Sequence, residues 1–135
     1  MNKQEILDFI TKNPIAYVAT ADGNKPHVRA MGTYRADENG IIFSMQSDKN
    51  VYQQLIANLE TELCYFNDGT QVRVNGTMQQ LTDMDLKKEI AEARPFMKPG
   101  IEQNGWDYVG VFILKNGKAS VLDMKNPGPM TYTDL

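Results

Sequence analysis

The sequence predicts a mainly β, α+β domain: a small antiparallel split β-barrel of six to seven strands with peripheral helices. Short apolar or alternating runs are separated by turn signals such as Asp-Gly and Asn-Gly, which is typical of antiparallel strands. Two helical patterns are inserted after the third and the fifth of these runs. Helices in those places are expected to lie at the periphery of a barrel.

Size and charge limit the class of protein. The 135 residues form one predicted domain, 1–135, and the formal net charge of −3 argues against a general binder of nucleic acids or anionic membranes. The single cysteine, Cys64, can form no intrachain disulfide. With no signal-peptide pattern and no long apolar run, a cytoplasmic location is expected.

The first part of the chain predicts a helix followed by three strands. Apolar residues at helical spacing indicate a helix over 2–12, which Pro14 ends. Turn sequences then divide three extended runs. The strands are expected at 15–20, 26–35 and 41–46.

The predicted strand over 26–35 has two different faces. Arg29 shares one face with His27 and Met31, because side chains alternate along a strand. Val28 and Ala30 share the other face. We expect this face of small residues to point into the crowded barrel.

The rest of the chain predicts two further helices and four strands. Ser47 or Asp48 can cap the second helix, and Asp83 can cap the third. Asn116-Gly117 predicts a tight two-residue turn between the last two strands. The expected elements are a helix over about 50–58, strands over 62–66 and 70–81, a helix over 84–93, an irregular segment over Arg94–Asp107, a hairpin of 108–114 with 118–123, and an extended tail over 126–135.

Reactive side chains are scarce. His27 is the only histidine, and one histidine with one cysteine cannot form an ordinary zinc site. The chain contains no glycine-rich nucleotide-binding motif and no nucleophile elbow. Cys64, in an apolar run, is expected to be an inert core thiol. An enzyme with this equipment would depend on a cofactor for its chemistry.

A phosphate could be held only by side chains and by the start of a helix. Arg29 and Lys49 are the candidate cations, and Ser47 with the nearby amides can add hydrogen bonds. The alternative is that both cations are simply solvated.

Three segments of the chain form a recognisable set. They are the arginine-bearing strand Pro26–Met31, the pair Phe43-Ser44-Met45 followed by Ser47-Asp48-Lys49, and the Gln-Val-Arg-Val-Asn-Gly run of Gln71–Gly76. In this order they resemble the arginine-bearing strand, the aromatic–hydroxyl pair with its phosphate-binding basic residue, and the Gln-Val-x-Val-x-Gly strand of the pyridoxamine 5′-phosphate oxidase-like, FMN-binding split-barrel family. Order and spacing agree over Ile6–Met124.

The resemblance implies two FMN sites at the interface of a homodimer. Arg29 and Lys49 would hold the phosphate, with Ser44 and Ser47 as hydrogen-bonding neighbours. Gln71 of the partner subunit would approach the flavin ring. The residues that would line the ribityl chain and the ring are Val28, Ala30, Met31, Phe43 and Met45.

The chain also departs from the family pattern. Asp48 stands where oxidases often have a second basic residue, and 125–135 lacks their substrate-binding segment. These differences argue against pyridoxamine-phosphate oxidation and favour the short bacterial branch of stress-protein or nitroimidazole-resistance type. Trp106 either covers the flavin and selects substrate or anchors its loop to the barrel. The role of His27 stays open.

The resemblance implies an FMN-dependent oxidoreductase that passes electrons from a reduced nicotinamide or another donor to a small acceptor. One alternative is a non-catalytic electron carrier, flavin store or redox sensor, which the sparse acid–base equipment favours. Another is a barrel that binds no flavin, such as a haem protein with His27 as axial ligand.

Overall fold

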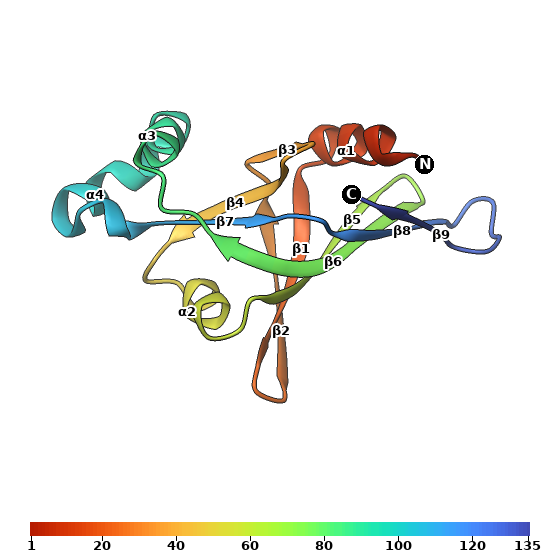
Figure 1. The fold of residues 1–135 in the computed structure, drawn as a ribbon, viewed down its shortest axis with the longest axis horizontal. Helices are drawn as coiled ribbons and strands as arrows, with labels where there is room; N and C mark the ends of the chain where they lie inside the picture. Colours follow the sequence, from red (N-terminus) through yellow and green to blue (C-terminus); the bar gives the residue numbers. More distant parts are fainter.

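The computed structural model covers residues 1–135 and shows a mainly β, α+β fold in which helices surround a strongly curved antiparallel sheet (Figure 1). The predicted split barrel with peripheral helices is confirmed. None of the helices is long and apolar enough to cross a membrane. The helices are α1 (Lys3–Lys12), α2 (Asn50–Ala57), α3 (Met84–Ala93) and α4 (Lys98–Asn104). The strands are β1 (Ile15–Asp22), β2 (Lys25–Gly32), β3 (Arg35–Asp37), β4 (Gly40–Gln46), β5 (Glu60–Asn67), β6 (Thr70–Gln80), β7 (Val109–Leu114), β8 (Lys118–Asp123) and β9 (Thr131–Asp134).

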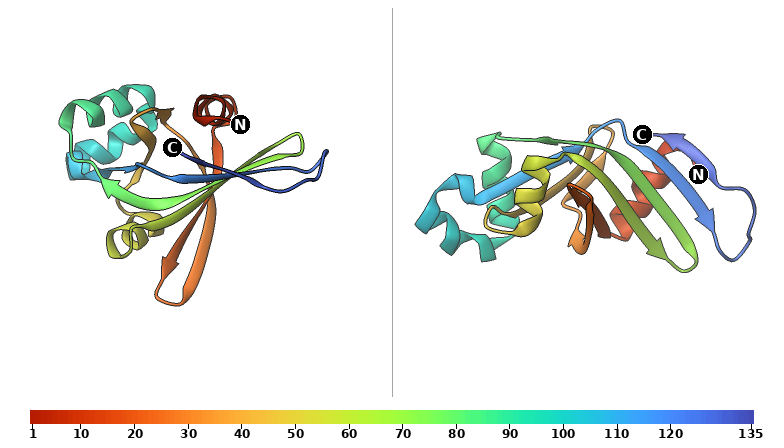
Figure 2. Two further views of the ribbon diagram at one scale, coloured as in Figure 1. Left: turned by 45° about the vertical axis from the view of Figure 1, so that its right-hand side comes forward. Right: turned by 90° about the horizontal axis from the view of Figure 1, so that it is seen from below.

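Seven strands follow one path through the sheet, in the order β2-β1-β5-β6-β7-β4-β3. The two ends of this path, β2 and β3, do not pair, so the barrel stays split. Strand β8 pairs with β6, and β9 adds to β8. The β1–β2 hairpin projects away from the rest of the sheet, while the two chain ends lie close together (Figures 1 and 2).

Two apolar clusters hold the fold together. The larger one fills the inside of the curved sheet, with Ile6 and Ile10 of α1 and Leu55 of α2 among its members. The smaller one packs Ile90 of α3 and Met97 against the other face of β4 and β7. All six residues of β7 are buried, because both faces of this strand are covered.

The expected hairpin around Asn116-Gly117 is wrong. Strands β7 and β8 do not pair with each other; β8 pairs with the first half of β6 and β7 with its last three residues. The connection bends sharply through a crowded place, where a Cβ on Gly117 would lie 2.5 Å from Leu114 Cδ2. The predicted tail also differs, because its end forms β9.

The segment Arg94–Asp107, predicted to be irregular, is largely helical. Two short 3-10 turns flank α4, and proline stands at the start of both the first turn and α4. Proline suits the first turn of a helix, where its missing N–H is not needed. The predicted cap of α3 is confirmed, because the Asp83 carboxylate accepts from the Asp85 and Leu86 N–H groups. The predicted cap of α2 at Ser47 or Asp48 is wrong, because Lys49 is the N-cap and makes no side-chain cap bond.

The two faces of β2 are the reverse of the prediction. Val28 is 68% exposed, so the small-residue face points away from the barrel. Arg29 and Met31 are half-buried on the inner face. The register explains this, because Arg29 pairs with Val18, whose side chain is in the core. Cys64 lies opposite the exposed Tyr17 and is half-buried on the outer face, so it is not a core thiol.

Candidate functional site

A cleft of about 390 Å³ lies between β2, the end of β4 and the start of α2. Its volume falls in the range of small-molecule sites in proteins. The cleft exists because β2 and β4 do not pair where the barrel is split. Its lining residues are Arg29, Ala30, Met31, Gly32, Ser44, Met45, Gln46, Lys49, Asn50, Val51 and Arg94.

Three of these residues are cations without a carboxylate partner: Arg29, Lys49 and Arg94. The ion pairs of the chain use other basic residues, namely Arg35, Arg73, Lys98 and Lys125. No acidic residue lines the cleft. An acidic protein of net charge −3 thus concentrates uncompensated positive charge in one cavity, which favours an anionic ligand.

Arg29 is fixed at one end of the cleft by hydrogen bonds. Its Nη1 donates to Thr20 Oγ1 at 2.8 Å and to the Val18 carbonyl at 3.2 Å, and its Nη2 donates to Gln54 Oε1. Burial lowers the pKa of Arg29 from its ordinary value, but a guanidinium stays charged in proteins. Three of its five N–H groups have acceptors, so two remain for a ligand.

Lys49 stands at the N-terminus of α2. Its side chain is exposed and forms no ion pair, and Asn50 and Val51 beside it also line the cleft. The first turn of an α-helix leaves N–H groups without intrahelical acceptors, and these bind anions. Gln54 of the same helix accepts from Arg29, so α2 connects Arg29 with the cleft wall that Lys49 lines.

Arg94 lies at the opposite end. Its Nη1 donates to Ser44 Oγ at 2.8 Å, its Nη2 donates to the Gly32 carbonyl at 3.4 Å, and its guanidinium is 5.4 Å from the centre of the Tyr34 ring. Burial lowers the pKa of Arg94, while the nearby Tyr34 acts in the other direction. All its partners are neutral.

The sequence pattern of the family described as pyridoxamine 5′-phosphate oxidase matches residues 3–104. The chain belongs to the pyridoxamine 5′-phosphate oxidase family. Its match covers α1 to α4, and therefore every element that lines the cleft. A comparison with curated protein sequences found no match.

Solved structures share the fold. A NimC/NimA family protein from Clostridium acetobutylicum has a TM-score of 0.79 and 22% identity, over 98% of this chain and 92% of that one. A protein related to general stress protein 26, also from Clostridium acetobutylicum, has a TM-score of 0.74 and 17% identity, over 98% and 93%. An FMN-binding protein related to pyridoxamine 5′-phosphate oxidase from Nostoc punctiforme has a TM-score of 0.66 and 17% identity, over 96% and 87%.

Within this family fold, about half of the residues singled out from the sequence meet in the cleft. Phe43 does not, because its side chain is in the barrel core and 1% exposed. Ser47 follows β4 and does not line the cleft; its N–H donates to the Tyr108 carbonyl. Trp106 packs on the smaller apolar cluster, as the anchoring alternative expects. Those that do line the cleft are Arg29, Ala30, Met31, Ser44, Met45 and Lys49.

Val28 and Gln71 lie on the outer face of the sheet, beyond the cleft. Gln71 pairs with the exposed Phe66, and Cys64, on that face of β5, lies opposite Tyr17 on β1. In a strand pair, directly opposite residues share a face. The outer face of β1, β2, β5 and β6 therefore carries exposed apolar groups at Tyr17, Val28 and Phe66.

Sequence reasoning missed Arg94, Thr20 and Gln54. Arg94 had a usable signal, because it precedes a proline at the end of a predicted helix. The residue before proline is driven out of the helical conformation, which turns its side chain away from the helix surface. Its φ of −130° and ψ of 71° agree with this. Thr20 and Gln54 are brought to Arg29 only by the tertiary fold.

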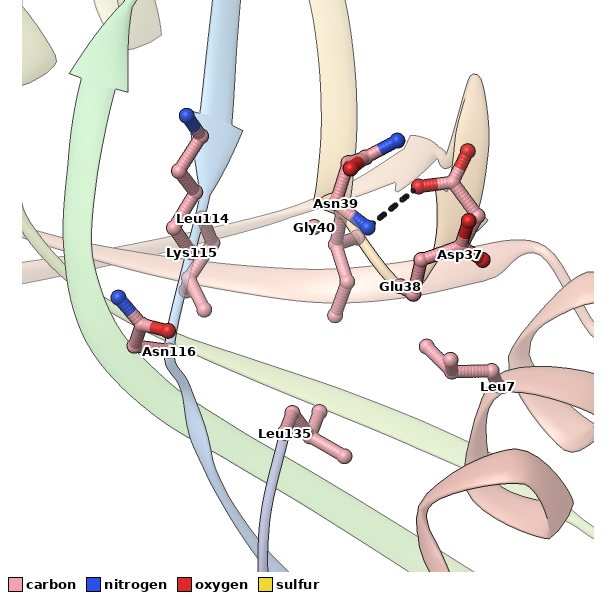
Figure 3. A pocket seen from close by; sticks show the side chains of 10 residues that line it. Leu7, Asp37, Glu38, Asn39, Gly40, Leu114, Lys115, Asn116 and Leu135 are labelled. Atoms are coloured by element: carbon pink, nitrogen blue, oxygen red, sulfur yellow. Dashed lines mark hydrogen bonds between the residues drawn. The ribbon is translucent and has the colours of Figure 1, made fainter.

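Two other cavities have less suitable charge. One of about 240 Å³ lies between the β3–β4 turn, the end of β7 and the C-terminus (Figure 3). Asp37 and Glu38 line it with a single cation, Lys115. The other, of about 640 Å³, lies between the β1–β2 hairpin and α2 and contains Asp22 and His27 but no lysine or arginine. Neither favours a phosphate.

Proposed function

We propose that this protein binds FMN in the cleft between β2 and β4. We further propose that it acts as an oxidoreductase, passing electrons from a reduced nicotinamide or another donor to a small acceptor. The supporting observation is the cleft with three cations and no carboxylate. The FMN-binding relative from Nostoc punctiforme has the same fold, which agrees with the proposal.

The Arg29 end suits the cofactor phosphate. A phosphate monoester carries a charge of about −2, and Arg29 with Lys49 supplies two positive charges. Asn50 and Val51 add the first turn of α2, whose N–H groups attract anions. Asp48 takes no part in this balance, because it forms no ion pair with Lys49 and does not line the cleft.

The middle of the cleft suits a flat apolar ring. Met31 and Met45 line it between the charged ends. Methionine is adaptable and makes favourable contacts with aromatic rings. When bound, FMN would supply the electron-transfer chemistry. The side chains of this protein would hold and orient it and keep water from one face.

We also propose that the protein forms a homodimer through the outer face of the sheet. Ala30 lines the cleft and, being exposed beside Val28, also belongs to that outer face, so the cleft opens onto it. Exposed apolar side chains at Tyr17, Val28 and Phe66 mark this face as an interaction surface. Gln71 of the partner subunit would then complete the cofactor site.

A non-catalytic flavin carrier is the second candidate. It is favoured by the lining of the cleft, which contains no histidine, cysteine, aspartate or glutamate that could act as a general acid or base near neutral pH. A turnover assay distinguishes the enzyme from the carrier: the FMN-loaded protein is given reduced nicotinamide and, in turn, quinones, nitroaromatics and oxygen as acceptors. Turnover by the FMN-loaded protein would establish an enzyme, whereas bound flavin without turnover would indicate a carrier.

The cofactor is tested by the visible absorption of purified protein after incubation with FMN and desalting. We expect flavin absorption at about one FMN per chain. A colourless protein would refute FMN binding, and a Soret band would instead indicate haem. Sedimentation velocity at the same concentrations tests the dimer separately.

A further inference from the structure

Arg94 lies at the far end of the cleft, and its charge is not required to balance a phosphate that Arg29 and Lys49 already hold. Arg94 donates to the carbonyl of Gly32, which follows Arg29 by three residues in β2. Three residues of extended strand span about 10 Å. This is more than one phosphate group can bridge, so Arg94 must face a different part of a ligand that fills the cleft.

The direction of the Arg29 side chain increases the distance between the Arg29 and Arg94 guanidinium groups. Its guanidinium reaches Thr20, and Thr20 pairs with His27, which lies on the side of Arg29 away from Gly32. The Arg29 and Arg94 side chains thus point to opposite ends of β2. The cleft has two cationic ends with apolar residues between them.

The charge of Arg94 is fixed in place before a ligand arrives. Ser44, the Gly32 carbonyl and the Tyr34 ring hold the guanidinium, and three of its five N–H groups have no acceptor. A Cβ on Gly32 would lie 3.7 Å from Arg94 Nη2, so the guanidinium passes at van der Waals distance from the β2 backbone. A preorganised charge acts most strongly on negative charge that develops during a reaction.

Reduction of a flavin develops such a charge. A hydride from a reduced nicotinamide brings two electrons and one proton to the neutral oxidised flavin, and leaves the nicotinamide oxidised. The reduced flavin then carries one negative charge near neutral pH. A positive charge close to the ring nitrogens favours this state.

We propose that Arg94 selectively stabilises the reduced, negatively charged state of the bound flavin and so raises its reduction potential. This inference rests on the proposed function, because a phosphate held at Arg29 and Lys49 is what directs the ring toward Arg94. The potential of bound relative to free FMN reflects the ratio of affinities for the reduced and oxidised forms.

The test measures the midpoint potential of the FMN-loaded protein against a reference dye under anaerobic reduction, together with the affinity for oxidised FMN. Arg94→Gln should weaken binding of reduced FMN about tenfold more than binding of oxidised FMN, which lowers the potential by about 30 mV for a two-electron couple. Arg94→Lys should retain most of the wild-type potential. The matched control is Arg35→Gln, since Arg35 pairs with Asp37 and Glu89 and does not line the cleft.

One result would overturn the inference: a midpoint potential that is the same in Arg94→Gln as in the wild type, which means that the affinities for both redox states fall equally or not at all. If Arg94→Gln also abolishes a benzoate-induced change in the flavin spectrum, Arg94 binds a carboxylate substrate instead.

Two further results keep the two proposals separate. If Arg94→Gln does not fold, Arg94→Met takes its place, because it also removes the charge: a potential below the wild-type value supports the inference, and an unchanged potential refutes it. Failure of the wild-type protein to take up FMN would refute the proposed function itself. Uptake of FMN with a potential that does not change when Arg94 is replaced would refute only the role of Arg94.

Discussion

Replacing Lys49 by glutamine should weaken FMN binding through the phosphate alone. The change keeps the length of the side chain and removes its charge. A hydrogen bond to a charged group contributes about 1.5–3 kcal/mol. Lys49 is exposed and its interactions are screened by water and salt, so the lower value applies. About 1.5 kcal/mol corresponds to a roughly tenfold rise in Kd.

The assay is quenching of FMN fluorescence on binding, repeated with riboflavin, which lacks the phosphate. Lys49→Gln should leave riboflavin affinity unchanged, and its effect on FMN should shrink as the salt concentration rises. The control is Lys125→Gln, because Lys125 is also exposed but pairs with Asp68 outside the cleft. An unchanged Kd for FMN, or an equal loss for riboflavin, would refute the role given to Lys49.

Three further predictions concern the fold. Tyr65→Phe should lower the free energy of unfolding in urea by about 1–3 kcal/mol, because it leaves the buried Thr33 hydroxyl without its 2.7 Å partner; Tyr132→Phe, on an exposed ring, should have no effect. Gly110→Ala should cost about 1–3 kcal/mol in the same assay, since its Cβ would lie 2.7 Å from the Tyr52 ring, whereas Gly128→Ala should be neutral. Burial raises the pKa of the Cys64 thiol, so iodoacetamide should alkylate it more slowly at pH 8 than in urea-unfolded protein, and equal rates would contradict this.

Local sequence signals predicted most of the elements, because each depends on neighbouring residues. The turns at Gly23 and at Asp68-Gly69 place positive φ angles where hairpins need them. Asp83 predicted the start of α3 in the same way. The hairpin predicted at Asn116-Gly117 is wrong for a non-local reason. Strand β6 is long enough to pair with β8 at one end and with β7 at the other, so β7 and β8 do not pair with each other.

The sequence predicted only those residues of the candidate site whose place follows from a single strand or helix. Arg29 and Lys49 were identified because each stands at a definite place in one element. The inward direction of Arg29 depends on which face of β1 is buried, which the sequence of β2 does not contain. Arg94 is 62 positions from the carbonyl it contacts and reaches the cleft only because α3 packs on β4 and β7.

Native mass spectrometry of the purified protein with excess FMN would test the central claim most directly, since it counts cofactors per assembly. The account predicts a species of two chains with two FMN molecules. A single chain with one FMN would preserve the cleft assignment and remove the dimer. Protein that stays free of FMN at every concentration would contradict the claim that the cations of this cleft hold a flavin phosphate.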